Sequence, residues 1–147
     1  MQNRVVITGL GVVAPNGVGL NNFEQAIRNG ESGIQFFDQL ADMNFSCCVG
    51  GIPSVSEALT LNYLTALQLR NFSSSGIIYG CIAGVDAWKD AGLEFAEEEP
   101  LWDSGCIFGT GISGVEKMRE AAYKLDEGKV KRLGSNSVSQ TMSSGVS

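Results

Sequence analysis

Residues Arg4–Gly19, RVVITGLGVVAPNGVG, decide the fold that we expect for this chain. Val5–Ile7 form an apolar, β-branched run without a polar break, which is typical of a strand buried on both faces. Gly9 and Gly11 follow it and allow a tight turn or the close approach of another backbone. Pro15–Gly17 then end the run with residues that favour turns. We therefore expect the first central strand of a parallel or mixed sheet in an α/β protein.

Composition and charge narrow the classes of partner. The chain has 147 residues, of which 44% are hydrophobic and 18% are charged, as in globular proteins with an apolar core. The net charge is -6 and the basic residues are interleaved with acidic ones, so we expect no nucleic-acid binding. Lys129–Arg132 form a small basic patch that fits an acidic partner. We find no signal peptide before Arg4 and no apolar run of membrane-spanning length, so we expect a cytoplasmic protein without membrane contact.

The chain contains no histidine, and its four cysteines are Cys47, Cys48, Cys81 and Cys106. None of them forms a C-x-x-C pair, so we expect free thiols in a reducing compartment and no metal site. Ser-His-Asp and Cys-His catalysis cannot be assembled from a polypeptide without histidine. Any such chemistry must therefore use residues from elsewhere, and we expect no metal and no cofactor in this chain.

Apolar residues at helical spacing predict helices at Asn21–Arg28, Glu57–Leu69, Gly76–Leu93 and Gly114–Glu127. Capping-box spacing places Asn21, Ser54 and Ser113 at helix starts, and glycines follow the helix ends. A second buried strand is predicted at Ser104–Phe108, and a short one around Cys48. Strands separated by helical crossovers indicate a parallel α/β arrangement. Two strands do not complete a sheet, so we expect the opening portion of a larger domain.

Two glycine-rich turns call for a comparison with nucleotide-binding motifs. Gly9, Gly11 and Ala14 have the G-x-G-x-x-A spacing of the dinucleotide fingerprint, but a turn rather than a helix follows them. Gly109–Gly114, GTGISG, lies between the second predicted strand and a helix, where backbone amides can hold an anion. It lacks the Lys-Ser/Thr of a P-loop, which favours a tight turn. The dense serines of 135–147 fit turns, caps and local backbone hydrogen bonds.

The order of several stretches resembles one family. These stretches are Arg4–Pro15 (RVVITGLGVVAP), Asn29–Ile34 (NGESGI), Gly80–Leu93 (ending KDAGL), Gly109–Gly114 (GTGISG) and Thr141–Ser147 (TMSSGVS). Together they resemble the N-terminal part of the β-ketoacyl-acyl carrier protein synthases, the ketosynthases of fatty-acid and polyketide synthesis. The resemblance covers essentially the whole chain and only the first part of a family member.

The resemblance implies a thiolase-type layered fold, in which two similar α/β halves stack, with residues 1–147 as a partial N-terminal ketosynthase domain in the first half. It implies a decarboxylative Claisen condensation on a cysteine-bound acyl group. The implied partners are acyl carrier protein, carrying phosphopantetheine-linked acyl and malonyl groups, and a second subunit in a homodimer or a ketosynthase heterodimer. The family's nucleophilic cysteine and histidines correspond to positions beyond Thr141–Ser147, so no catalytic residue is assigned to this chain.

One site residue carries over from the resemblance. Ile112 occupies the position in the glycine turn that, in similar enzymes, borders the inner end of the acyl pocket and gates chain length. A branched side chain there would occlude the pocket until it rotates; the other interpretation is that Ile112 fills a core. Leu133–Met142 and Leu69–Phe72 depart from the usual family pattern. Two other functions stay open: a non-catalytic, chain-length-determining partner subunit, and a nucleotide-binding α/β domain.

Overall fold

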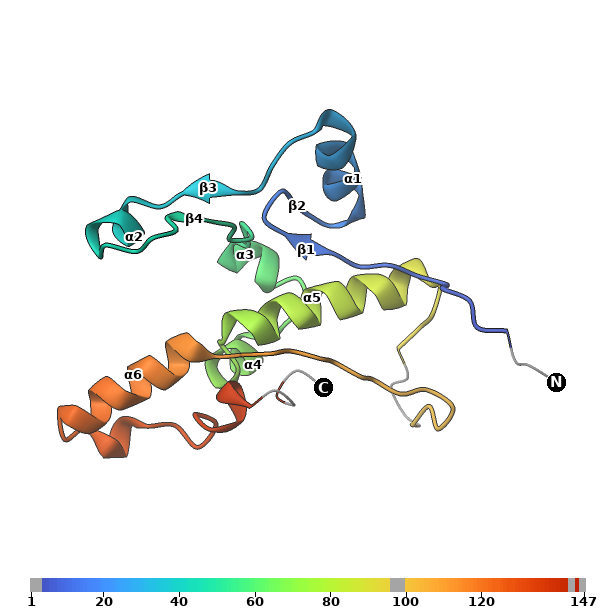
Figure 1. Cartoon of the computed structure of the whole chain (residues 1–147). Helices are drawn as coiled ribbons and strands as arrows, with labels where there is room; N and C mark the ends of the chain where they lie inside the picture. Colours follow the sequence, from blue (N-terminus) through green and yellow to red (C-terminus); the bar gives the residue numbers. More distant parts are fainter. Residues whose placement is uncertain (1–3, 96–99, 143–144, 146–147) are drawn as a thin grey trace. The chain divides into compact units, whose positions relative to one another are not determined.

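The computed structural model describes residues 4–95, 100–142 and 145. They form two compact units, one of residues 1–57 with 83–93 and one of residues 58–82 with 94–147. The long helix α5 (Ser75–Asp90) begins in the second unit and ends in the first. Figure 1 shows the course of the chain.

The described part of the first unit contains two small antiparallel strand pairs, two helices of its own and the second half of α5. β1 (Val13–Ala14) pairs with β2 (Gly17–Val18), with Val13 opposite Val18. β3 (Gln35–Phe36) pairs with β4 (Val49–Gly50), which confirms a short strand next to Cys48. The helices are α1 (Leu20–Asn29) and α2 (Asp38–Asp42).

Helix α1 begins and ends at glycines. Gly19 is its N-cap, with φ 81°, and no side chain caps the helix, so the prediction that Asn21 would do so is wrong. At the other end, Gly30 adopts the left-handed conformation, with φ 69°, and its N–H bonds the carbonyl groups of Ala26 and Ile27. Gly30 thus ends the helix as the sequence predicts, because glycine enters this conformation without a Cβ clash.

The opening segment, residues 4–12, forms no strand, and it runs alongside the second half of α5 at Gly9–Gly11 (Figure 1). Cβ atoms added to Gly9 and Gly11 would lie within 3.0 Å of backbone atoms of Ala83, Ala87 and Ala91. The Leu10 N–H also donates to Asp90 Oδ2 at 2.9 Å. The two glycines therefore serve close packing of the segment against the helix.

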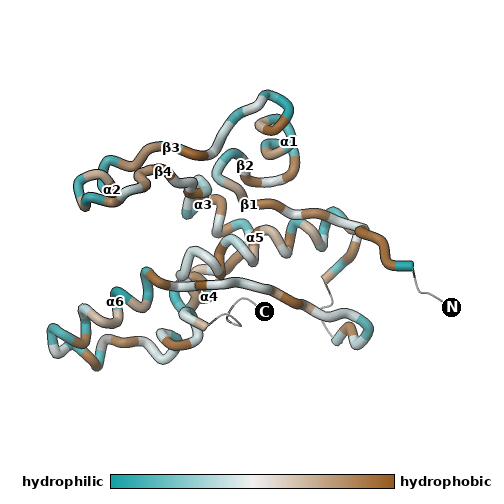
Figure 2. Tube along the Cα trace, in the orientation of Figure 1, coloured by the Kyte–Doolittle hydropathy of each residue, from teal (hydrophilic) through white to brown (hydrophobic). Residues whose placement is uncertain are grey.

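The strand predicted at Val5–Ile7 is wrong for the residues that the structure describes. The segment has no regular secondary structure, and Val5 is 94% exposed. Figure 2 shows its apolar character in brown. A strand forms when a neighbouring strand bonds its N–H and C=O groups, and the described residues place no strand beside Val5–Ile7. Apolar β-branched composition alone does not create that neighbour.

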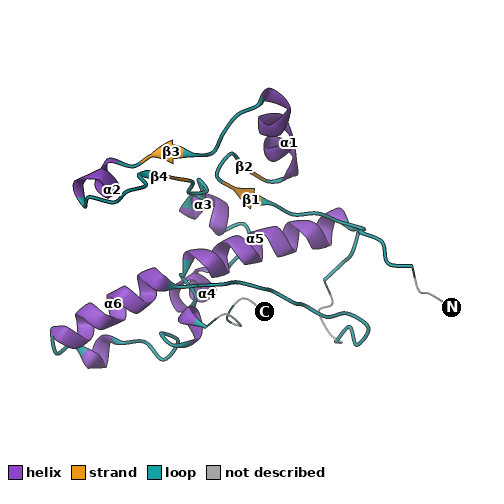
Figure 3. Ribbon diagram, viewed as in Figure 1, coloured by secondary structure: helices purple, strands orange, loops and turns teal. Residues whose placement is uncertain are grey.

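The regular elements that the structure describes in the second unit are helices, joined by long loops (Figure 3). Its elements are α3 (Glu57–Thr60), α4 (Ala66–Asn71), the start of α5, α6 (Val115–Asp126) and the 3₁₀ turns η1 (Val130–Arg132) and η2 (Ser139–Thr141). Ile82 is fully buried, and Ile77 is nearly so. The long helix predicted around Gly76–Leu93 is confirmed.

The single helix predicted at Glu57–Leu69 is wrong, because the chain leaves the helix after Thr60 and starts a new one at Ala66. Thr65 takes an extended conformation, and its hydroxyl accepts from the Gln68 N–H, while the Gln68 side chain accepts from the Thr65 N–H. This reciprocal capping box satisfies backbone N–H groups at the start of α4, and it thereby stabilises the interruption between α3 and α4.

The strand predicted at Ser104–Phe108 is also wrong for the described residues: the segment is extended without strand pairing, and Ile107 is 98% exposed. The described strands pair antiparallel, in two-residue ladders, rather than in the expected parallel sheet. Residues 96–99 of the acidic stretch Glu94–Pro100 lie outside the described residues, as do 143, 144, 146 and 147 of the serine-rich stretch 135–147. The longest described helix, α5, has 16 residues, and none of these helices has the length and apolar character to cross a membrane.

Candidate functional site

The glycine turn Gly109–Gly114 leads into α6. It is irregular, and the Thr110 hydroxyl donates to the Ile112 carbonyl at 3.0 Å. Ile112 is 78% exposed, so within the described residues it does not fill a core. Gly114 is the N-cap of α6, with φ 62°, so the prediction that Ser113 would cap this helix is wrong. A left-handed N-cap favours glycine, which explains the place of Gly114 in the turn.

The end of this turn packs against two other segments of the second unit. A Cβ on Gly76, at the start of α5, would lie 3.0 Å from Ser113 Oγ. A Cβ on Gly114 would collide with the Gln140 carbonyl oxygen and lie 2.8 Å from its carbon. Ser113 and Gly114 thus pack closely against the start of α5 and against η2, and at Gly114 the facing atoms are backbone, so no larger side chain fits there.

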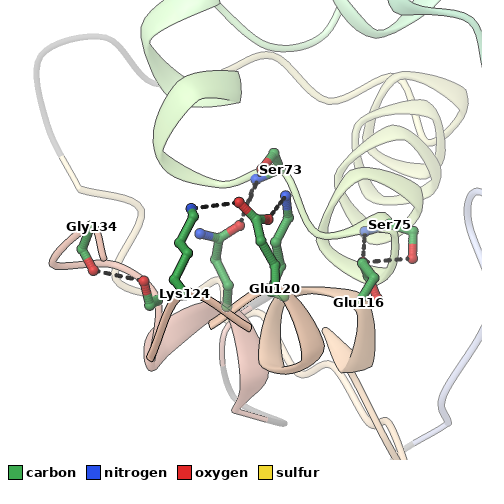
Figure 4. Close-up of polar contacts among 9 residues, drawn as sticks. Ser73, Ser75, Glu116, Glu120, Lys124 and Gly134 are labelled. Atoms are coloured by element: carbon green, nitrogen blue, oxygen red, sulfur yellow. Dashed lines mark hydrogen bonds and ion pairs between the residues drawn. The ribbon is translucent and has the colours of Figure 1, made fainter. Parts of the chain in front are cut away.

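Four residues join the same three segments by hydrogen bonds, and we call Ser73, Ser75, Glu116 and Gln140 the α5–α6 polar network. Glu116 Oε1 accepts from the Ser75 N–H at 2.7 Å and from its hydroxyl at 3.1 Å (Figure 4). Gln140 Oε1 accepts from the Ser73 N–H at 2.8 Å. Both acceptors therefore bond amides at or just before the start of α5, where a helix leaves N–H groups free.

Opposing effects act on the Glu116 carboxyl. Partial burial would raise its pKa, but hydrogen bonds from the Ser75 backbone and hydroxyl, from its own backbone N–H, and the charge of Lys117 outweigh burial and hold the pKa below the usual 4.5. Glu116 is therefore ionised at neutral pH. Its negative charge lies at the positive end of the α5 helix dipole, which stabilises both.

The hydroxyls of Ser74 and Ser113 lie in the same region. Both Oγ atoms are buried and have no hydrogen-bond partner among the described residues. Ser74 is fully buried directly before α5. A buried hydroxyl without a hydrogen-bond partner lowers stability, so the close packing around the turn must offset this loss.

A polar pocket of about 280 Å³ lies beside the network, between α4, α6 and the loop of residues 133–137. Its charged lining residues are Arg70, Lys117, Lys124 and Glu120. Lys124 Nζ lies 2.6 Å and Lys117 Nζ 3.4 Å from the Glu120 carboxylate. The hydrogen bond from Lys124, with the charges of both lysines, lowers the Glu120 pKa. One carboxylate against three cations leaves this pocket positive.

The basic patch predicted at Lys129–Arg132 is partly neutralised, because Lys129 Nζ pairs with Glu127 at 2.6 Å. The serines nearby make local hydrogen bonds as expected: the Ser137 hydroxyl donates to the Gly134 carbonyl at 2.7 Å, and the Ser139 hydroxyl to the Asn136 carbonyl at 3.0 Å. Turn formation therefore accounts for these hydroxyls.

The fingerprint-like glycines do not form a phosphate site. The α5 backbone fills the space beside Gly9 and Gly11, and the Leu10 amide already donates to a carboxylate, Asp90. A phosphate group would have to displace that carboxylate. This arrangement argues against the nucleotide-binding alternative, which also requires a helix start at this point.

All four cysteines are free thiols. Burial, and to a smaller extent the charge of Cys106, raise the pKa of Cys81. Among the residues that the structure describes, no group of three or more Cys, Asp or Glu side chains is placed to hold a metal ion.

Comparison with known proteins identifies the family of this chain. Residues 2–147 match the family model described as beta-ketoacyl synthase, N-terminal domain. The chain belongs to the β-ketoacyl synthase family. It is 31% identical over 126 residues to 3-oxoacyl-[acyl-carrier-protein] synthase 2 of Vibrio harveyi, which covers 86% of this chain and 29% of that protein. It is 31% identical over 123 residues to the tetracenomycin polyketide synthase ketoacyl synthase beta subunit of Streptomyces glaucescens. That alignment covers 82% of this chain and 29% of that protein.

The fold agrees with this membership of the ketosynthase family. The crystal structure of a beta-ketoacyl synthase from Burkholderia phymatum STM815 matches with a TM-score of 0.70 at 25% identity, over 99% of this chain and 35% of that one. The thiolase-type α/β class expected from the sequence is thereby confirmed. The chain spans 29% of the length of each of the two curated relatives above.

Sequence analysis of this ketosynthase chain missed the α5–α6 polar network and the pocket beside it. Capping-box spacing with Ser113 predicts for Glu116 only a role at the start of its own helix, whereas Glu116 bonds Ser75, 41 residues away in the sequence. The run of three serines, Ser73–Ser75, before an apolar helix is a helix-start signal, but it does not name the distant acceptor. Ile112, the one residue that the resemblance singled out, does not line the polar pocket beside the network.

Proposed function

We propose that this chain is the N-terminal part of a β-ketoacyl-acyl carrier protein synthase that extends acyl chains by decarboxylative Claisen condensation, in fatty-acid or polyketide synthesis. The family match over residues 2–147 carries the proposal. In this reaction the malonyl C–C bond to the carboxylate breaks and releases carbon dioxide. The carbanion left behind forms a new bond to the acyl carbonyl carbon, and the cysteine thiolate leaves.

We assign the cysteine and histidines of that reaction to the rest of the ketosynthase, because this chain has no histidine and none of its cysteines occupies the nucleophile's place. Residues 1–147 are then a partial N-terminal ketosynthase domain. The proposed partners are acyl carrier protein, carrying phosphopantetheine-linked acyl and malonyl groups, and a second ketosynthase subunit. The positive pocket lined by Arg70, Lys117 and Lys124 suits an acidic partner. We propose the cytoplasm as its location.

The Ile112 side chain is proposed as the gate at the inner end of the acyl pocket. Its exposure within this chain supports the proposal, because a gating side chain must face a space that the described residues do not fill. In the complete ketosynthase, Ile112→Phe is expected to shorten the products and Ile112→Ala to admit longer ones. An unchanged product-length profile in both variants would remove Ile112 from the site.

The function is tested by incubating the complete ketosynthase with acyl- and malonyl-loaded carrier protein. Release of carbon dioxide and a β-ketoacyl product two carbons longer are expected, whereas chain 1–147 alone is expected to be inert. Condensation by the isolated chain would contradict the assignment of the cysteine and histidines to the rest of the enzyme.

A second candidate function is the non-catalytic, chain-length-determining partner subunit, because the chain is 31% identical to the Streptomyces glaucescens beta subunit as well as to the Vibrio harveyi synthase. In that case the complete protein does not condense substrates alone. It changes the product length when it is mixed with a catalytic ketosynthase subunit. The two candidates are separated by assaying the protein with and without such a subunit.

A further inference from the structure

The segment that carries Ile112 is anchored at one end. Ser113 and Gly114 follow Ile112 directly, and both are in close contact with other segments: Ser113 with Gly76, and Gly114 with the backbone of Gln140. The contact of Ser113 is made by its side chain and that of Gly114 by backbone atoms. A shift of either neighbour would therefore displace the end of the turn, since closely packed atoms transmit displacement.

Hydrogen bonds hold these neighbours in place. Glu116 lies on the first turn of α6 and bonds the Ser75 N–H at 2.7 Å, which ties α6 to the start of α5. Gln140 is only 8% exposed and bonds the Ser73 N–H at 2.8 Å, which ties η2 to the same place. The end of the glycine turn lies where these two ties meet. Each acceptor bonds at least one main-chain amide, and that bond does not depend on the side-chain rotamer of Ser73 or Ser75.

We propose that Glu116 and Gln140 are positioning residues that set the place of Ile112 by clamping the end of the glycine turn against the start of α5. The inference rests on the proposed gating role of Ile112. Neither residue needs to touch the acyl chain. The clamp sets how far the gate side chain reaches into the acyl pocket, and so it contributes to chain-length specificity.

The experiment compares product lengths of the complete ketosynthase or, if it is a partner subunit, of its pair with a catalytic subunit. Glu116→Ala is expected to broaden the product distribution and to shift its most abundant length by at least one condensation cycle. Glu116→Gln keeps an acceptor oxygen and is expected to restore most of the wild-type distribution. Glu24→Ala is the matched control, because Glu24 is also a helix carboxylate with a charge-assisted hydrogen bond, to Arg28 at 2.8 Å. It is expected to leave the distribution unchanged.

A double variant shows whether Glu116 acts through the gate. In an Ile112→Ala background, Glu116→Ala is expected to cause no further shift of product length. An equal shift in both backgrounds overturns the proposal. So does a Glu116→Ala enzyme that loses yield and thermal stability but keeps the wild-type distribution, where Ile112→Ala does change product length. If Glu116→Ala is insoluble, Gln140→Leu tests the other tie, since leucine keeps the buried bulk but removes the acceptor.

A structural readout separates this inference from the gating proposal. In crystals of the complete protein, Glu116→Ala is expected to displace residues 109–114 more than Glu24→Ala does. An undisplaced turn refutes the clamp whatever the products are. A displaced turn, together with Ile112 variants that leave product length unchanged, supports the clamp and refutes the gate.

Discussion

The carboxylate of Glu116 caps a helix other than its own: it accepts from both the N–H and the hydroxyl of Ser75, 41 residues earlier in the chain. A side-chain acceptor at a helix start replaces the bond that the first amides lack. Here the acceptor is charged and comes from the first turn of α6. One residue therefore stabilises the start of α5 and fixes the distance between two helices.

Removal of this cap should be measurable as local opening. We expect Glu116→Ala to destabilise the start of α5 by about 1 kcal/mol, so that amides of its first turn exchange with solvent about fivefold faster. Hydrogen exchange read by mass spectrometry measures this change. Glu24→Ala should leave exchange in α5 unchanged. Equal exchange in wild type and Glu116→Ala would show that another group caps the helix.

The pH dependence of the same cap has a definite sign. The folded-state pKa of Glu116 lies below its usual 4.5, so the cap contributes fully above the unfolded-state pKa and is lost as the pH falls through the folded-state pKa. Slow exchange at the start of α5, relative to Glu116→Gln, should therefore persist at neutral pH and disappear in acid. A difference between the two proteins that stays constant down to the lowest pH would contradict the ionised cap.

Added salt should affect differently the two carboxyl groups of α6 whose pKa is lowered, Glu116 and Glu120. The Glu120 pKa is lowered first by its hydrogen bond to Lys124 and then by the lysine charges, whereas Glu116 is held mainly by hydrogen bonds from Ser75. Added salt screens exposed charges more than hydrogen bonds to the backbone. NMR titration in low and high salt should show the Glu120 pKa rising toward its usual value and the Glu116 pKa staying low. A larger rise for Glu116 would refute this assignment of causes.

Local signals in the sequence predict part of the fold. The helical spacing around Ile77 and Ile82 predicts α5, and Gly128 follows α6 with φ 68°, as expected for a helix stop. The close packing of Gly9 and Gly11 also follows from their spacing in an apolar stretch. In each case the determining interaction lies within a few residues or concerns only the absence of a side chain.

The strands at Val5–Ile7 and Ser104–Phe108 could not be predicted for this chain from composition. Their apolar character is as expected, but a strand requires a partner, and partners depend on the whole sheet. The α5–α6 polar network could not be predicted either, because Glu116 and Ser75 are far apart in the sequence. Ser113 was expected to cap α6, but Gly114 takes that place, since the backbone there is left-handed.

The opening segment offers a direct test of glycine packing. Gly11→Ala would bring a methyl group into the backbone of Ala83 and Ala87, and it should lower the free energy of unfolding by about 1–3 kcal/mol. Gly105→Ala is the control, because an added Cβ there meets nothing within 4 Å; it should change stability by less than about 1 kcal/mol. Urea-induced unfolding followed by circular dichroism measures both. Equal stability of the two variants would mean that the segment does not pack on α5.

Thiol chemistry provides a test of burial in the second unit. Burial raises the pKa of Cys81, and the charge of Cys106 adds to the effect, whereas Cys47 is exposed. Since the thiolate is the reactive form, iodoacetamide should modify Cys47 several-fold faster than Cys81 in the native protein, and the Cys81 rate should still rise above pH 9.0, its usual pKa. Cys106→Ser should speed the modification of Cys81 slightly, because one source of the raised pKa is gone. Peptide mass spectrometry over a time course measures the rates, and equal rates for Cys47 and Cys81 would contradict the burial of Cys81.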